Sequence, residues 1–165
     1  MVLDVDGVLS DGSIVISQTG ELFKSFNVRD GLGIKLLQRA GIEVAILTGR
    51  TSEIVARRAA ELGIRQVEQG KLEKRPTLLR MLEALDIRPD ELATWGDDLP
   101  DLPCLRVAGF AATPKNGSDA LTPYVHWRSS FDGGRGAVRE LAERILKAQG
   151  KWDELVASLY LSQGQ

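Results

Sequence analysis

The sequence predicts an α/β fold, in which a doubly wound parallel sheet carries helices on both of its faces. Three observations support this fold class. Short apolar runs of strand length alternate along the chain with longer segments of helical periodicity. Polar and acidic residues directly follow these runs, as expected at the carboxyl ends of parallel strands. The 165 residues, 43% of them hydrophobic, are enough for one domain with a real core.

The first expected strand is Met1–Leu3, which leads directly into the acidic segment Asp4–Gly12. Residues 13–26 then interrupt the alternation of strands and helices. Apolar residues alternate on both sides of a turn at residues 18–20, and this pattern predicts a small β-hairpin. Because two strands alone are marginal in water, we expect the apolar side chains of this hairpin to pack on something else, such as another copy of the chain.

The next two helices have clear boundary signals. One follows residues 27–31 and ends at Gly41, and the other begins at residue 51 or 52 and ends at Gly63. Glycine readily adopts the left-handed conformation that closes a helix, and Thr or Ser caps a first turn. A buried strand over residues 43–47 lies between the two helices.

The rest of the chain continues the alternation. A strand over 64–68 leads to a helix that has Pro76 near its first turn, a position that tolerates proline. The later elements are a strand over 92–95, a short helix over 102–107, a strand over 109–112, an edge strand over 124–127, a glycine-rich loop over 133–136 and a helix over 137–149. The tail, residues 150–165, is only weakly helical. This order predicts a Rossmann-like sheet in a single domain that spans residues 1–165.

Composition excludes several classes of protein. The net charge is −2 and the basic residues are dispersed, so we expect no nucleic-acid partner. A single cysteine, Cys104, excludes an internal disulfide and suits a reducing compartment. The sequence has no run that could span a bilayer and no visible signal peptide, so we expect a cytoplasmic protein without a membrane partner.

Polar groups of complementary kinds follow four of the expected strands. In chain order they are Asp4 and Asp6, then Thr48, then Lys74, and finally Asp97, Asp98 and Asp101. Each alone could be a turn residue, a helix cap or a solvated charge. Together they indicate one site, because the carboxyl ends of parallel strands meet at one edge of the sheet. Carboxylates that lie so close together need a cation between them, and Mg²⁺ prefers such oxygen ligands.

These groups suit phosphoryl transfer, in which catalysis is mainly positioning and the stabilisation of negative charge. A carboxylate can act as the nucleophile and form an aspartyl-phosphate. A cation reduces its repulsion with phosphate, a hydroxyl and an ammonium hold the phosphate oxygens, and an acid protonates the leaving alkoxide. The groups available for these parts are Asp4, Mg²⁺, Thr48, Lys74 and Asp6.

The motifs Asp-x-Asp-Gly-Val, the strand ending in Thr48, Lys74, and Gly-Asp-Asp-x-x-Asp have the order of the four motifs of the haloacid dehalogenase superfamily, which the chain therefore resembles. More narrowly, it resembles the capless 3-deoxy-D-manno-octulosonate 8-phosphate (KDO 8-phosphate) phosphatases. That resemblance covers nearly the whole chain. It depends on the hairpin and on the segments DVDGVLSDG, FNVRDGLGI, EVAILTGR, QGKLEK, GDDLPDLP and GGRGAVRE.

The resemblance implies a role for each acidic residue. Asp4 is expected to be the nucleophile and a Mg²⁺ ligand. Asp6 is expected to be the general acid/base, to touch the substrate and to give its backbone carbonyl to the metal. Asp97 is expected to be the third protein ligand. Supporting positions around the metal or the lysine are expected for Asp98 and Asp101.

The resemblance also implies the residues that bind substrate. Thr48 and Lys74 are expected to hold the phosphoryl oxygens, and Lys74 is preferred to Lys71 because the family's lysine lies four residues after the glycine of Gln-Gly. Further contacts are expected at Asn27, Val28, Arg29, Asp30, Gly31, Arg50 and Arg58. A planar guanidinium suits the carboxylate of a sugar acid. Arg57 is an equal candidate to Arg58 by composition.

By this resemblance the chain is expected to hydrolyse KDO 8-phosphate to KDO and phosphate for lipopolysaccharide biosynthesis. The first alternative is a phosphatase of a related nonulosonate 9-phosphate, whose relatives tend to have an acidic residue in place of Arg50. A receiver-type phospho-accepting domain is another alternative, but its phosphorylated aspartate lies on a middle strand. A catalytically inactive regulatory domain is disfavoured, because every catalytic position is filled.

Capless phosphatases of this kind resemble homotetramers whose hairpins join at the centre, so we expect a homotetramer joined through the hairpin flap at residues 13–26. Closed symmetric assemblies are common, and the apolar hairpin fits one. The tail, with Trp152, Leu155 and Tyr160, has two open interpretations. It either reaches a neighbouring active site or forms a plain final helix.

Overall fold

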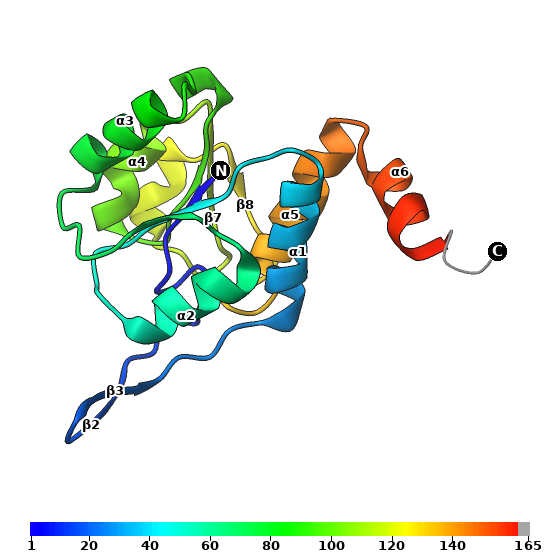
Figure 1. Cartoon of the computed structure of the whole chain (residues 1–165). Coiled ribbons are helices and arrows are strands. Elements are labelled where there is room, and N and C mark those ends of the chain that lie inside the picture. Colours follow the sequence, from blue (N-terminus) through cyan, green and yellow to red (C-terminus); the bar gives the residue numbers. More distant parts are fainter. Residues whose placement is uncertain (162–165) are drawn as a thin grey trace.

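A computed structural model describes residues 1–161 and contains a six-stranded sheet in which every neighbouring pair is parallel (Figure 1). The sheet has the strand order β5-β4-β1-β6-β7-β8. Its strands are β1 (Val2–Leu3), β4 (Ala45–Leu47), β5 (Gln66–Glu68), β6 (Ala93–Trp95), β7 (Phe110–Thr113) and β8 (Trp127–Arg128). The predicted α/β class with a doubly wound parallel sheet is therefore confirmed.

Helices cover both faces of the sheet. One face packs against α1 (Val28–Arg39), α2 (Glu53–Leu62) and α5 (Ala137–Ala148), and the other against α3 (Lys74–Ala84) and α4 (Leu102–Leu105). The two-residue period of a strand explains the division. Leu3 and Ile46 belong to the core beneath α1, α2 and α5, whereas Val2, Ala45 and Leu47 belong to the core beneath α3 and α4. No helix within residues 1–161 is long and apolar enough to cross a membrane.

The predicted hairpin consists of β2 (Val15–Ser17) and β3 (Gly20–Phe23), which pair as a separate antiparallel ribbon. It projects from the body of the molecule immediately after the acidic segment that follows β1 (Figure 1). Its large apolar side chains are exposed, with Ile16 at 69%, Leu22 at 59% and Phe23 at 52%. Within the described chain, therefore, no other segment covers these apolar side chains of the hairpin.

The expected edge strand over 124–127 was wrong in its position. Residues 119–124 form a 3₁₀ helix around the buried Leu121, and only Trp127–Arg128 pair with β7. Pro123 lies inside that helix and has no N–H to offer a sheet ladder. The strand therefore begins after the proline.

The tail forms a final helix along the described part of its length. Helix α6 (Trp152–Val156) continues into a π-helical turn over Ala157–Leu161. The Trp152 ring lies 5.6 Å from the Arg139 guanidinium carbon and 5.2 Å from Lys147 Nζ, both on α5. Residues 162–165, the end of the predicted tail, lie outside the described residues.

Candidate active site

The predicted strand-end groups converge on one open pocket of about 500 Å³. It lies at the carboxyl ends of β1, β4 and β6, because the segments after these strands supply its walls. The predicted residues that line it are Asp4, Asp6, Thr48, Arg50, Lys74, Asp97, Asp98 and Asp101. The other lining residues are Gly12, Ile14, Gly49, Lys71, Leu72 and Pro100.

A buried lysine joins two of the aspartates. Lys74 Nζ lies 2.9 Å from Asp4 Oδ1 and 2.6 Å from Asp101 Oδ1, and all three residues are at most 8% exposed. Asp4 continues the ladder of β1, since its N–H donates to the Trp95 carbonyl at 3.1 Å. Lys74 is the first residue of α3, which places its side chain over the strand ends. Lys71 instead pairs with Glu68 at 3.3 Å, so Lys74 is the lysine beside Asp4.

The Asp97 carboxylate lies against a backbone position that only glycine can fill. Gly7 has φ +86°, and a Cβ at this position would lie 2.1 Å from Asp97 Oδ2. The Asp97 loop is held by Asp101, whose Oδ2 accepts from the Asp97 N–H at 2.9 Å and from the Asp98 N–H at 3.3 Å. Asp98 itself is exposed and caps the next turn by accepting from the Leu99 N–H.

Three carboxylates gather without enough positive charge to balance them. One oxygen each of Asp4, Asp97 and Asp101 lies within 4.8 Å of the others. Burial, reinforced by the Asp101 charge and opposed by Lys74, raises the pKa of Asp4 to about 6. Burial and the negative charges of Asp101, Asp4 and Asp98 raise the pKa of Asp97 to about 7. A further cation beside Lys74 would therefore favour the ionised form of these carboxylates.

The cluster fits a hard divalent ion. Asp4 Oδ1 is fully buried, and its partner in the described chain is the Lys74 ammonium at 2.9 Å. Carboxylate oxygens of Asp4 and Asp97, which follow two neighbouring strands and lie within 4.8 Å of each other, are a suitable ligand pair for Mg²⁺. The Asp6 carboxylate does not belong to this group of three, and the expected contact between its backbone carbonyl and the metal stays a prediction.

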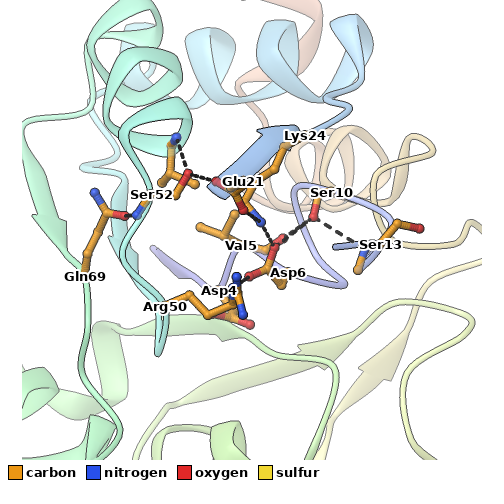
Figure 2. A network of polar contacts seen from close by, with 12 residues as sticks. Asp4, Val5, Asp6, Ser10, Ser13, Glu21, Lys24, Arg50, Ser52 and Gln69 are labelled. Carbon is orange, nitrogen blue, oxygen red and sulfur yellow. Dashed lines mark hydrogen bonds and ion pairs between the residues drawn. The ribbon is translucent and has the colours of Figure 1, made fainter. Parts of the chain in front are cut away.

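The Asp6 carboxylate faces the hairpin, as Figure 2 shows. Its Oδ1 lies 2.5 Å from Lys24 Nζ and 3.4 Å from Ser10 Oγ, and its Oδ2 lies 3.7 Å from Arg50 Nε. Sequence reasoning missed Lys24 and its partner Glu21. The only signal was a lysine between the apolar Phe23 and Phe26, a pattern that also occurs on solvated hairpins.

Thr48 lies at the end of β4 and is 2% exposed. Its N–H donates to the Glu68 carbonyl at 2.9 Å, and its carbonyl accepts from the Lys71 N–H at 3.1 Å. These bonds fix the loop that follows β4 against the loop that follows β5. Thr48 therefore lines the pocket from a backbone position that is hydrogen-bonded on both its N–H and its carbonyl.

The predicted contacts in the segment over residues 27–31, and Arg58, do not line this pocket. Asn27 caps α1 by accepting from the Arg29 N–H at 2.8 Å. Asp30 is buried and accepts from the backbone N–H groups of Gly136 and Arg139, at 3.1 and 2.8 Å, at the start of α5. Val28 and Arg29 are exposed.

Gly31 on α1 and Arg58 on α2 are in close contact. A Cβ on Gly31 would lie 2.5 Å from Arg58 Nη2. Arg58 also pairs with Glu61 at 2.8 Å and lies over the Phe26 ring at 5.7 Å. Within the described chain these residues join α1 to α2, and their contact with substrate stays a prediction.

Comparison with known proteins places the geometry among phosphatases. A family model described as haloacid dehalogenase-like hydrolase matches residues 22–109. The 3-deoxy-D-manno-octulosonate 8-phosphate phosphatase KdsC of Escherichia coli (strain K12) is 45% identical over 154 residues, covering 93% of this chain and 82% of that protein. The corresponding protein of Yersinia pestis is 42% identical over 151 residues, covering 92% and 81%.

Solved structures agree with the sequence relatives. The 3-deoxy-D-manno-octulosonate 8-phosphate phosphatase of Moraxella catarrhalis, crystallised with magnesium ion, phosphate ion and KDO, superposes with a TM-score of 0.92 at 44% identity, covering 95% of this chain and 90% of that chain. The cobalt-bound enzyme of Haemophilus influenzae superposes with a TM-score of 0.89 at 43% identity, covering 91% and 88%.

Proposed function

The chain belongs to the haloacid dehalogenase-like hydrolases and, within them, to the KDO 8-phosphate phosphatases, and from this premise we propose how its residues divide the reaction. The activity is the Mg²⁺-dependent hydrolysis of KDO 8-phosphate to KDO and phosphate. The observation that carries it is the meeting of Asp4, Lys74 and Asp97 in one pocket, in a chain 45% identical to such phosphatases over nearly its whole length.

We assign the nucleophile to Asp4 and the proton transfers to Asp6. A carboxylate oxygen of Asp4 attacks phosphorus, the bond from phosphorus to the sugar oxygen breaks, and Asp6 gives its proton to that oxygen. In the second half, Asp6 takes a proton from the water that attacks the aspartyl-phosphate, and Asp4 is released. Two carboxylates two residues apart can therefore serve both halves of the reaction.

The remaining pocket residues are proposed to bind the metal ion and the phosphoryl group. Asp4, Asp97 and the Asp6 backbone carbonyl are suited to hold Mg²⁺, which when bound supplies positive charge between the nucleophile and the phosphate. Thr48 and Lys74 are proposed to bind the phosphoryl oxygens, and the support for this is that both line the pocket that contains Asp4. Asp98 and Asp101 are proposed to support this arrangement from the loop after β6.

Arg50 is the proposed contact for the sugar-acid carboxylate. It lines the pocket, and its side chain is 46% exposed, so the guanidinium can turn toward a ligand. Among the other predicted contacts, the exposed Val28 and Arg29 are available to a substrate, as is Arg58 in part. Asn27, Asp30 and Gly31 are proposed to act on the substrate through the shape that they give to this segment.

A substrate comparison tests the proposed function. Phosphate release is measured from KDO 8-phosphate and from a nonulosonate 9-phosphate, each with Mg²⁺ and with a chelator. We expect kcat/KM for KDO 8-phosphate to be at least about tenfold higher, because one extra carbon and its polar groups change the fit of a phosphorylated sugar acid by about 1–3 kcal/mol. The reverse preference would assign the nonulosonate substrate, and no metal-dependent release would contradict both.

We also propose a cytoplasmic homotetramer that acts in lipopolysaccharide biosynthesis, with one catalytic domain over residues 1–165. The support for assembly is the exposed apolar surface of the hairpin, at Ile16, Leu22 and Phe23. A surface of this kind is typical of a contact between proteins. The support for the biosynthetic role is that the relatives are, by name, phosphatases of KDO 8-phosphate.

A further inference from the structure

Lys24 is a buried cation at the base of an otherwise exposed hairpin. Its side chain is 1% exposed, whereas those of Leu22 and Phe23 project into solvent. Its Nζ lies 2.5 Å from Asp6 Oδ1 and 2.9 Å from Glu21 Oε1 (Figure 2). The hairpin therefore places one ammonium directly behind the residue that exchanges protons with the substrate.

The contact between Lys24 and Glu21 continues to the segments that follow β4 and β5. Ser52 Oγ donates to Glu21 Oε2, and the Ser52 N–H donates to Gln69 Oε1 at 2.8 Å. Ser52 also caps α2 by accepting from the Val55 N–H. The chain of contacts in Figure 2 thus joins the acidic loop, the hairpin and the loops after β4 and β5. Lys24 is therefore held by Asp6 in the segment after β1 and by Glu21 on the hairpin.

The ammonium is charged under neutral conditions. Burial opposes the charged form, but hydrogen bonds and ion pairs with Asp6 and Glu21 outweigh it and raise the pKa of Lys24. A buried charge paired in this way loses its partner only at considerable cost. The pair with Lys24 therefore holds the Asp6 carboxylate in one orientation.

We propose that Lys24 is a positioning residue for Asp6, an inference that rests on the proposed function. Lys24 and Ser10 both bind Oδ1, which leaves Oδ2, on the side of Arg50, to exchange the proton. In the first half Asp6 is protonated on Oδ2 by the water of the previous turnover, while its Oδ1 still accepts from the Lys24 ammonium, and it gives that proton to the leaving sugar oxygen as the bond to phosphorus breaks. In the second half the same oxygen takes a proton from the attacking water.

Two substrates with different leaving groups distinguish a positioning role of Lys24 from a purely structural one. The alkoxide of a sugar phosphate needs a proton as it leaves, and a well-placed acid contributes about 10²–10⁴ in rate. The phenolate of p-nitrophenyl phosphate leaves without one. A variant that only misplaces Asp6 therefore slows the sugar phosphate selectively, whereas a variant that damages the whole pocket slows both substrates.

The experiment compares Lys24→Met with wild type on KDO 8-phosphate and on p-nitrophenyl phosphate, both with saturating Mg²⁺. We expect kcat for KDO 8-phosphate to fall about 100-fold and kcat for p-nitrophenyl phosphate less than about 5-fold, because a misplacement near 1 Å costs about 10². Lys115→Met, which removes an exposed lysine, is the matched control and is expected to keep both rates.

A second variant covers the case in which Lys24→Met does not fold. Glu21→Gln keeps Lys24 and the size of its partner but removes one charge that holds it. We expect a smaller loss, about 3- to 10-fold, again confined to the sugar phosphate. Equal losses on both substrates, a rise in KM alone, or no change in either variant would overturn the role of Lys24. Failure of wild type to hydrolyse KDO 8-phosphate would instead overturn the proposed function, and the inference with it.

Discussion

A carboxylate oxygen of Asp4 and one of Asp97, which follow the neighbouring strands β1 and β6, lie within 4.8 Å of each other. Two ligands of a single Mg²⁺ lie at most about 4.2 Å apart, since each is about 2.1 Å from the ion. A small adjustment of either side chain therefore lets both hold one ion. The two residues are brought together by the parallel register of β1 and β6, which pairs Leu3 with Trp95.

Stability should depend on Mg²⁺ and on pH together. The pKa values of Asp4 and Asp97 are raised to about 6 and about 7, above the ordinary value of 3.8. The folded state therefore binds a proton at Asp4 and at Asp97 more tightly than the unfolded chain does. Below about pH 4 both carboxyl groups are protonated in either state, and they cost the folded state no stability. The cost grows as the pH rises through 6 and 7, where Mg²⁺ offsets it.

The expected result is a Tm that Mg²⁺ raises far more at pH 8 than at pH 5. An ion present at 100 times its Kd contributes about 2.7 kcal/mol, or roughly 5–10 °C for a chain of this length. Differential scanning calorimetry with and without Mg²⁺ measures this shift in Tm at each pH. The Asp97→Asn variant should lose most of the shift. Equal shifts at the two pH values would contradict the shared site.

Asp4→Asn should abolish turnover while the protein stays folded. Asparagine keeps the shape of the side chain but cannot attack phosphorus, so we expect kcat to fall by at least about 10³-fold. Without Mg²⁺ its Tm should match or exceed that of wild type, because a repelling buried charge is gone. Asp90→Asn, at an exposed position, is the control. Turnover above about a tenth of the wild-type rate would remove Asp4 as nucleophile.

Lys74→Met should lower both stability and activity. Lys74 lies between Asp4 and Asp101, and breaking a buried ion pair costs about 3–5 kcal/mol, roughly 10 °C in Tm here. We expect kcat to fall at least about 100-fold. Adding Asp101→Asn should restore part of the Tm but none of the activity. A double variant that regains turnover would mean that Lys74 serves only to balance charge.

Ile16→Asp should separate the subunits of the proposed tetramer. Ile16 lies on the hairpin with 69% of its surface exposed, and a buried aspartate at a subunit contact would be unpaired. Sedimentation velocity should show wild type at about four times the 18.0 kDa chain mass and the variant at a smaller mass. Thr19→Asp, in the hairpin turn, is the control. Wild type that sediments as a monomer would refute the assembly.

The sequence predicted the convergence of the site because that convergence follows from topology. Asp4, Thr48 and Asp97 each come directly after an apolar run, and parallel strands bring such positions to one edge. Lys74 was chosen over Lys71 by a family spacing, and the structure places Lys74 beside Asp4. These positions depend on the period and order of elements, which a sequence displays.

The parts that the sequence did not predict depend on contacts between distant residues. Lys24 reaches Asp6 across 18 positions, and its partner Glu21 reaches Ser52 across 31. Asp30 accepts from the Gly136 N–H, 106 residues away at the start of α5, and its expected contact with substrate stays a prediction. No local pattern distinguishes a lysine or an aspartate with such a partner from a solvated one. The late start of β8 has a local cause, because Pro123 lies in the preceding 3₁₀ helix and has no N–H to offer a sheet ladder.

The central claim is that Asp4 and Asp97 hold one cation while Asp4 attacks phosphorus. The most direct test is a crystal structure of the protein with Mn²⁺ and beryllium fluoride, in which anomalous scattering locates the metal. We expect one Mn²⁺ bonded to both carboxylates, with beryllium attached to the other oxygen of Asp4. A metal that contacts only one of the two carboxylates, or beryllium bound to another side chain, would contradict it.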